Sequence, residues 1–537
     1  MGLSSLAKLV LATSAALGLH LMYLVYRRRK FFRNLPCPPH SWILGHLGIM
    51  GEMSSKLPPN CHPQLLLTEI QRTYDLPPVF YMDLWPAADP MVLLTEVEDM
   101  NYVQVLKPLQ QHPSSNDFLA PMVGRDVVAV VNGPTWKMLR NAMNPSFAPG
   151  HVKNLSGIII EECLTFRSTL SKLARAGRPF DMEVKGAELI FDIIARIVFN
   201  FPLAAQKRGS QTLSDLRELV HLVEAGFSMN PLDRLRAWWR RGAVTQRLNS
   251  EVKAKILERY QMLREQKVVP SRKDPYSTLD LMLREQLMRE EELKDLDLEF
   301  DRLLLSNIKG LLLGGHGTTN DTLCYCYMLL SKNPAVMAKL REEHTRVFAA
   351  DFDQTVQMLQ ADPYKLNELE YTTAVIKETL RLFPVGFGVR AAPPGATITS
   401  RGRPLPIDNG LAIVPLWHHM HYSEAYFADP ASFSPERFMD ADTVGRATFR
   451  SFSRGPRGCA GQELAIDELR IILLMTVRDF DFEYHHMKPN ERPRVKYTQL
   501  DTVFGDVVFQ ELGLEAKPRG GMVLKVHELK GGTSMKK

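Results

Sequence analysis

The sequence lacks the marks of a disulfide framework and of a zinc module. Its 537 residues contain six cysteines, at positions 37, 61, 163, 324, 326 and 459, and no two of them have C-x₂-C spacing. No glycine/serine linker, repeat or low-complexity tract divides the chain after its N-terminal region. The net charge of +6 is too small to indicate a nucleic-acid-binding protein. A hydrophobic share of 45% is ordinary for a globular protein with a sizeable core.

One long apolar run, residues 9–26, lies near the N-terminus and is long enough to span a bilayer. A basic cluster, residues 27–30, follows it, whereas a cleaved signal peptide carries its positive charge before the run. We therefore expect residues 1–30 to be a membrane anchor, with the N-terminus lumenal and the body cytosolic. On a cytosolic body the glycosylation sequons at Asn154 and Asn320 are expected to stay unused.

The rest of the chain is predicted to form a stiff proline-rich hinge and linker, residues 31–63, and one catalytic domain, residues 64–537. Residues 112–132 are weakly patterned. The patterning predicts strands at 79–82 and 91–94, helices over 300–331 and 371–383, a β-rich run at 507–509 and an alternating strand through Met522, Leu524 and Val526.

Residues 452–461, Phe-Ser-Arg-Gly-Pro-Arg-Gly-Cys-Ala-Gly, surround one cysteine with glycine and positive charge. A thiolate is a strongly donating ligand that survives where hydrogen-bond donors and cations lower its pKa. Arg457 supplies a cation, and the helix predicted to follow adds its N-terminal dipole. Three glycines should let backbone N–H groups turn inward at dihedral angles that other residues avoid: Gly455, Gly458 and Gly461. The alternative, a buried inert cysteine, is the usual state of a lone Cys.

The predicted helix over 300–331 contains Gly314, Gly315, His316, Gly317 and Thr318 in succession. Each mid-helix glycine costs roughly 1 kcal/mol relative to alanine, so a packing or functional reason is required. Close approach of a flat cofactor would supply one. The Thr318 hydroxyl can bond either to the carbonyl one turn earlier or to bound dioxygen. His316 is either a proton relay or a histidine satisfied within its own helix.

Three further patterns each allow two interpretations. Trp136 and Arg140 share a helical face and suit an anionic group, or are a half-buried Trp beside a solvated Arg. Glu378 and Arg381 also share a face, where a surface pair contributes only a few tenths of a kcal/mol. The basic and aromatic residues 234–241 indicate an interfacial segment or a solvated helix face with core tryptophans.

Four of these stretches together resemble the cytochrome P-450 superfamily over nearly the whole chain. Residues 452–461 fill every position of its haem-thiolate loop, and Glu378, Arg381 and Arg437 match its Glu-Arg-Arg triad. Residues 314–319 resemble its oxygen-activation motif, with Gly317 in place of the acid. The resemblance implies a mainly α fold with a minor β region, preceded by one transmembrane helix, that encloses haem b (iron protoporphyrin IX).

The resemblance also assigns roles to individual residues. It makes Cys459 the axial ligand of the haem iron and Thr318 the oxygen-activating alcohol, with water, substrate, Asp321 or His316 delivering protons. The triad is a scaffold. The other assigned residues are expected to contact the cofactor. Gly314, Gly315 and Gly317 form the groove of the long helix, and Phe452, Arg457 and Gly461 belong to the cysteine loop. The expected partners of the haem propionates are Trp136, Arg140 and Arg390.

The implied function is a monooxygenase of the endoplasmic reticulum membrane that oxidises a small lipophilic substrate. Its electrons come from NADPH through a flavoprotein reductase, with cytochrome b5 as a further partner. The segments 455–465 and 516–522 are similar to filamentous-fungal enzymes of secondary metabolism. Because Gly317 replaces the acid, a reductase-independent isomerase, dehydratase or peroxygenase is one alternative. A non-enzymatic haem-binding protein with His316 as sixth ligand is another.

Overall fold

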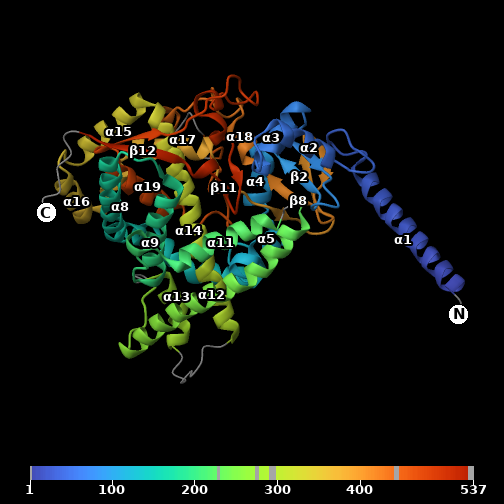
Figure 1. Ribbon diagram of the computed structural model, residues 1–537, viewed down its shortest axis with the longest axis horizontal. Helices are drawn as coiled ribbons and strands as arrows, with labels where there is room; N and C mark the ends of the chain where they lie inside the picture. Colours follow the sequence, from blue (N-terminus) through green and yellow to red (C-terminus); the bar gives the residue numbers. More distant parts are fainter. Residues whose placement is uncertain are drawn as a thin grey trace. The chain divides into compact units, whose positions relative to one another are not determined.

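The computed structural model describes residues 3–226, 230–272, 277–288, 298–440, 445 and 447–529. The chain forms two compact units. The first contains residues 1–112 and 388–420, and the second contains residues 113–387 and 421–537. Helices predominate and the sheets are small (Figure 1), so the predicted mainly α fold with a minor β region is confirmed.

The first unit contains a five-stranded sheet with the strand order β1-β2-β8-β5-β3, in which only β2 and β8 are parallel. Apolar side chains of α2, α3, β1 and β2 pack together as its core. The strands predicted at 79–82 and 91–94 are confirmed with the same bounds. The elements are α1 (Leu3–Phe32), α2 (Leu47–Lys56), α3 (Pro63–Thr73), β1 (Val79–Met82), β2 (Met91–Leu94), α4 (Val97–Asn101), the π-helix η1 (Tyr102–Leu106), β3 (Gln110–Gln111), β5 (Arg390–Ala391), β6 (Thr397–Ser400), β7 (Arg403–Pro406), β8 (Ala412–Pro415) and α18 (Trp417–His421).

Helix α1 contains a stretch, Ala7–Phe32, that is apolar and long enough to cross a membrane. Its C-terminal end is fixed to the first unit by Arg29, whose guanidinium is buried and paired with the Asp83 carboxylate. The same guanidinium donates to the Ile43 carbonyl at 3.0 Å and the Trp85 carbonyl at 3.1 Å. One member of the basic cluster is therefore a structural clamp and not a solvated charge.

The second unit is mostly helical, and α14 packs against α9, α17 and β9. Its sheets are small: β4-β12-β9 and the antiparallel hairpin β10-β11. The α-helices are α5 (Pro113–Val123), α6 (Gly133–Met143), α7 (Pro149–Asn154), α8 (Ser156–Ala176), α9 (Met182–Phe199), α10 (Ala205–Arg208), α11 (Gln211–Ala225), α12 (Pro231–Glu265), α13 (Thr278–Met288), α14 (Leu298–Lys332), α15 (Pro334–Val347), α16 (Phe352–Ala361), α17 (Glu370–Leu382), α19 (Gln462–Thr476) and α20 (Asp501–Phe504). The strands are β4 (Phe180–Asp181), β9 (Phe480–Tyr484), β10 (Glu511–Leu512), β11 (Ala516–Lys517) and β12 (Val523–Glu528), and the 3₁₀ helices are η2 (Asn144–Phe147), η3 (Pro363–Glu368), η4 (Pro435–Phe438), η5 (Gly505–Val508) and η6 (Arg519–Gly521).

The structure corrects three local expectations. The run at 507–509 is not β-structure: Gly505 turns the chain with a φ of 75° and is the first residue of η5, which includes Val507 and Val508. The weakly patterned segment 112–132 contains α5, which its sequence did not indicate. Trp238 and Trp239 are 62% and 80% exposed on α12, so they are not core residues. The interfacial reading of residues 234–241 stays a prediction.

Candidate active site

The loop that carries Cys459 is held by its own backbone and leads directly into α19. The Cys459 N–H donates to the Phe452 carbonyl at 2.9 Å, and the Gly458 N–H donates to the Gly455 carbonyl at 2.9 Å. Only Gly455 of the three loop glycines has a positive φ, 76°. Gly458 is required by proximity, because a Cβ there would lie 3.2 Å from the Gly455 oxygen. Gly461 has φ −86° as the N-cap of α19, so the expectation of unusual dihedral angles was wrong for Gly458 and Gly461.

The charge on the Cys459 thiol is decided by burial and by its neighbours. Burial raises its pKa, while the Gly461 N–H and the positive charge of Arg140 lower it, and the net direction is upward. The expected lowering by a hydrogen-bond donor and by a cation is present, but desolvation outweighs both. A coordinated metal ion deprotonates such a thiol outright. The Cys459 side chain is exposed despite the surrounding protein, so its sulfur is accessible to a ligand.

Helix α6 brings the predicted anion-binding pair to the same loop. The Arg457 guanidinium lies 4.3 Å from the centre of the Trp136 ring and donates to the Val131 carbonyl at 2.8 Å. Arg140, on the same helix, interacts electrostatically with Cys459, and burial lowers the pKa of Arg140. Two guanidinium groups and an indole beside a single thiol suit a cofactor with a metal centre and anionic edges. These residues therefore fit haem.

Arg390 and Phe452 have different surroundings. Arg390 lies on β5 in the first unit, where its buried guanidinium donates to the Gln111 side chain. Burial lowers its pKa to about 10. Phe452 contacts Phe449 edge-on, at 6.4 Å between ring centres, within the segment that precedes Cys459. The propionate role of Arg390 and the cofactor contact of Phe452 stay predictions.

The glycines at 314, 315 and 317 of α14 have three different environments. A Cβ on Gly314 would meet open space, whereas a Cβ on Gly315 would lie 2.7 Å from Ile194 Cγ1 of α9. Gly315 is thus required for the packing of α14 on α9. A Cβ on Gly317 would overlap the carboxyl group of Glu515. The Thr318 hydroxyl donates to the Gly314 carbonyl at 2.9 Å, which is the first of the two bonds expected for it.

His316 fits the reading of a histidine satisfied within its own helix. Its Nδ1 lies 2.7 Å from the Leu312 carbonyl, and its ring meets Phe191 of α9 edge-on. Burial lowers its pKa to about 4, so it is neutral at physiological pH. These contacts give no support to a relay or ligand role for His316.

Asp321 lies one turn beyond Gly317 on α14 and is 2% exposed. Within the described residues its Oδ2 has no hydrogen-bond partner. Burial and then the charge of Glu515 raise its pKa well above the ordinary value. Sequence reasoning named Asp321 but missed Glu515, because nothing in the sequence relates a hairpin residue to a helix almost two hundred positions earlier.

Glu378, Arg381 and Arg437 form the predicted triad. Arg381 donates to both carboxylate oxygens of Glu378 at 2.7 Å, and Arg437 donates to Glu378 Oε1 at 3.0 Å. The remaining guanidinium donors of Arg381 bond to the carbonyls of His421, Pro430 and Ser432. Because Arg381 and Glu378 are fully buried, the triad ties α17 to the segment before the cysteine loop.

A side-chain hydrogen bond links α14 to α19, the helix that follows the cysteine loop. Glu468 on α19 is 1% exposed and bonds to Thr319 of α14. Burial raises its pKa well above the ordinary value, while the bond from Thr319 lowers it. The sequence gave no sign of this contact, since Glu468 reads as an ordinary polar position of an amphipathic helix.

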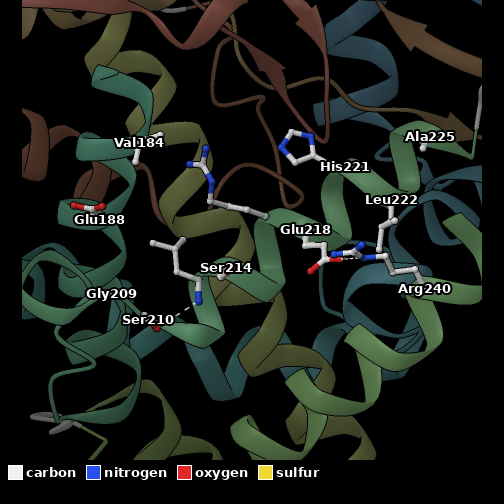
Figure 2. Close-up of a pocket in the computed structure, with 12 residues that line it drawn as sticks. Val184, Glu188, Gly209, Ser210, Ser214, Glu218, His221, Leu222, Ala225 and Arg240 are labelled. Atoms are coloured by element: carbon white, nitrogen blue, oxygen red, sulfur yellow. Dashed lines mark hydrogen bonds and ion pairs between the residues drawn. The ribbon is translucent and has the colours of Figure 1, made fainter. Parts of the chain in front are cut away.

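An open pocket of about 710 Å³ lies among residues of α9, α11 and α12 (Figure 2). Its lining carries an ion pair between Glu218 and Arg240, and Ser210 caps α11. Figure 2 also shows His221 of α11 among the residues that line the pocket. Charged side chains share this lining with apolar ones such as Val184, Leu213 and Leu222.

The mainly α fold and the cysteine flanked by cations define a class, the haem-thiolate proteins. The Cytochrome P450 family model matches residues 35–500, and the chain belongs to the cytochrome P450 family. It is 32% identical to cytochrome P450 monooxygenase acrF of Aspergillus aculeatus, over 88% of this chain and 99% of acrF. It is 28% identical to cytochrome P450 monooxygenase polC of Polytolypa hystricis, over 88% and 86% of the two chains, and 25% identical to cytochrome P450 4A7 of Oryctolagus cuniculus, over 88% and 90%.

Proposed function

We propose that the protein is a haem-thiolate monooxygenase that oxidises a small lipophilic molecule during the biosynthesis of a natural product. The observation that carries the proposal is the gathering of Trp136, Arg140 and Arg457 around Cys459. Family membership implies haem iron, and the named monooxygenases among its relatives support the reaction class. The fungal relatives and the segments 455–465 and 516–522 support a natural-product substrate.

Each side chain has a defined task in this function. Cys459 would hold the haem iron, and Arg140 and Trp136 would hold the propionates, with Arg457 stacked on the indole. Bound haem supplies activation of dioxygen and transfer of one oxygen atom to substrate. Thr318 holds a hydroxyl proton at Oγ1 beside the open space of Gly314. The triad keeps the segment before the cysteine loop in place.

The electrons come from NADPH through a flavoprotein reductase, with cytochrome b5 as an additional donor. We place the protein in the endoplasmic reticulum membrane, spanned once by α1, with a cytosolic catalytic body. The apolar surface of α1 and the buried clamp of Arg29 on Asp83 support this placement.

The carbon-monoxide difference spectrum of the dithionite-reduced protein tests the proposal. A strongly red-shifted Soret band is expected, because Cys459 would supply a thiolate ligand to the haem iron. Cys459→Ala should abolish that band. Cys37→Ala is the matched control, since Cys37 is also a free cysteine that is not fully buried, and should keep the band. A normal band in Cys459→Ala, or a histidine-type band in the unaltered protein, would contradict the assignment.

The absence of an acid at Gly317 favours a second candidate, a reductase-independent haem-thiolate isomerase, dehydratase or peroxygenase. The two candidates differ in their use of electrons. NADPH consumption by the purified protein with reductase and dioxygen is expected for the monooxygenase. A haem-loaded protein that turns over substrate with no NADPH consumption would establish the second candidate.

A further inference from the structure

A carboxyl group occupies the place that a side chain at position 317 would take. An ideal Cβ on Gly317 would overlap Glu515 Oε1 and lie 3.0 Å from Glu515 Cδ and 3.4 Å from Oε2. Of the other α14 glycines, Gly314 meets open space, whereas Gly310 and Gly315 each meet an apolar side chain. The acid absent from the helix is thus replaced in space by an acid from another part of the chain.

The hairpin that carries Glu515 is firmly attached. Glu515 lies between β10 and β11, where the Gly513 N–H donates to its carbonyl at 3.1 Å. The next residue, Ala516, donates its N–H to the Val385 carbonyl at 2.9 Å and accepts from the Gln510 amide at 2.9 Å. These bonds hold the backbone on both sides of the Glu515 side chain.

Glu515 forms a carboxyl pair with Asp321. The charge of Glu515 raises the cost of ionising Asp321. Glu515 Oε2 and Asp321 Oδ2 are both buried and have no hydrogen-bond partner among the residues that the structure describes. Burial is the main cause that raises the pKa of Glu515, to about 7. A buried carboxyl group with a raised pKa keeps its proton to near neutral pH, as a general acid requires.

The charged groups that face the pair come from three elements packed around it. Glu183 on α9 and Glu224 on α11 raise the cost of ionising the pair, while Lys517 on β11 and Arg217 on α11 lower it. Lys517 also bonds to Glu224 at 3.1 Å.

The same groups lead to the protein surface. Glu224 lies 3.2 Å from His221, whose side chain is 62% exposed and lines the pocket of Figure 2. Solvent therefore reaches the outer end of this charged network, from which a spent proton can be replaced.

We propose that Glu515, paired with Asp321, is the proton-donating carboxyl group of the oxygen-activation site. This inference rests on the proposed monooxygenase function. Glu515 gives its proton toward the Thr318 hydroxyl, which passes a proton on to the reduced dioxygen, and the Glu515 carboxylate regains a proton from solvent. Over a full turnover one substrate molecule, O₂, NADPH and H⁺ give the hydroxylated substrate, H₂O and NADP⁺. Without substrate, NADPH, H⁺ and O₂ give NADP⁺ and H₂O₂.

The decisive variant is Glu515→Gln, which keeps the shape of the side chain and removes the proton. Glu511→Gln is the matched control, because Glu511 lies on the same hairpin and pairs with Arg519 at 2.9 Å. Both variants are first examined by the carbon-monoxide difference spectrum. If the unaltered protein lacks the red-shifted band, the proposed function itself fails. If it has the band, the following measurements test Glu515 alone.

The first measurement is infrared spectroscopy of the haem-loaded ferric protein, without redox partners. A protonated-carboxyl band that disappears as pH rises through about 7 is expected, and it should be lost in Glu515→Gln and retained in Glu511→Gln.

The second measurement is NADPH oxidation by the protein with reductase and no substrate. Glu515→Gln should slow it about tenfold or more and flatten its pH profile, whereas Glu511→Gln should not.

A purely structural role for Glu515 predicts a different result. In that case Glu515→Gln, once haem-loaded, keeps the rate and pH profile of the unaltered protein, and the proposal is overturned. If Glu515→Gln does not load haem, the double variant Gly317→Asp/Glu515→Gly decides, because it moves the acid onto α14 and clears its space. Recovery of the pH-dependent rate supports the proposal, and a haem-loaded double variant that stays slow refutes it.

Discussion

Arg381→Ala should remove the cation of the Glu-Arg-Arg triad that makes the most hydrogen bonds. Arg381 is fully buried and makes five hydrogen bonds, two to the Glu378 carboxylate and one each to three carbonyls. Alanine would leave Glu378 with only Arg437 and the Ser434 N–H as partners, and would leave the three carbonyls without this donor.

The size of the effect follows from burial. Removing one partner of a buried ion pair costs about 3–5 kcal/mol, because the other charge stays buried and uncompensated. Total unfolding free energies of proteins are about 5–15 kcal/mol, so this loss is a large share of stability. Arg437→Ala should cost less, since Arg437 makes a single bond to Glu378 and is 8% exposed.

The assay is urea unfolding in detergent, combined with the haem content per protein chain. Arg125→Ala is the control: Arg125 pairs with Asp117 at 3.2 Å, but both side chains are about two-thirds exposed. An exposed pair of this kind contributes less than about 1 kcal/mol. A haem-loaded Arg381→Ala protein as stable as the Arg125→Ala control would refute the argument that the triad holds the segment before Cys459.

Gly315→Ala should destabilise the protein by about 1–3 kcal/mol, because its Cβ overlaps α9, while Gly314→Ala should be tolerated in urea unfolding. Thr318→Ala should keep haem but release more hydrogen peroxide per NADPH, and unchanged peroxide release would count against its proton role. The pH dependence of stability should depend on Glu515, whose pKa rises from 4.5 to about 7 on folding. Between these values the folded state holds a proton that the unfolded chain has released, so stability falls as pH rises, by about 3 kcal/mol at most. Glu515→Gln should flatten this fall in urea unfolding at a series of pH values.

The parts of the site that were predictable from the sequence are local in the chain. The helix after Cys459 follows from apolar spacing, and α17 ends one residue before its predicted boundary because Pro384 follows. The strands β1 and β2 were predicted with correct bounds because each is a short apolar run between turn residues. The pairing of Arg437 with Glu378 rested on family resemblance, since spacing does not place them together.

The parts that were not predictable depend on contacts between distant segments. The reason for Gly315 lies in Ile194 of α9, and the partner of Arg29 is Asp83, a residue more than fifty positions away. The net pKa direction of Cys459 depends on how deeply the loop is enclosed, which composition does not report. The position of Glu515 could not be predicted from its own stretch of sequence, because its hairpin is bonded to the residues that follow α17.

A side chain at position 317 would take the place of the Glu515 carboxyl group, which would have to move, and this gives a thermodynamic test that needs no substrate. Gly317→Asp alone should destabilise the protein, because its Cβ overlaps Glu515 Oε1 and its charge would join a carboxyl pair. Glu515→Gly alone should have a smaller effect, and after it the aspartate has room. Urea unfolding of both single variants and the double variant should therefore give a favourable coupling of about 0.5–3 kcal/mol. Strictly additive changes would mean that the two side chains do not share this space, and would remove the steric basis for Glu515 as the replacement acid.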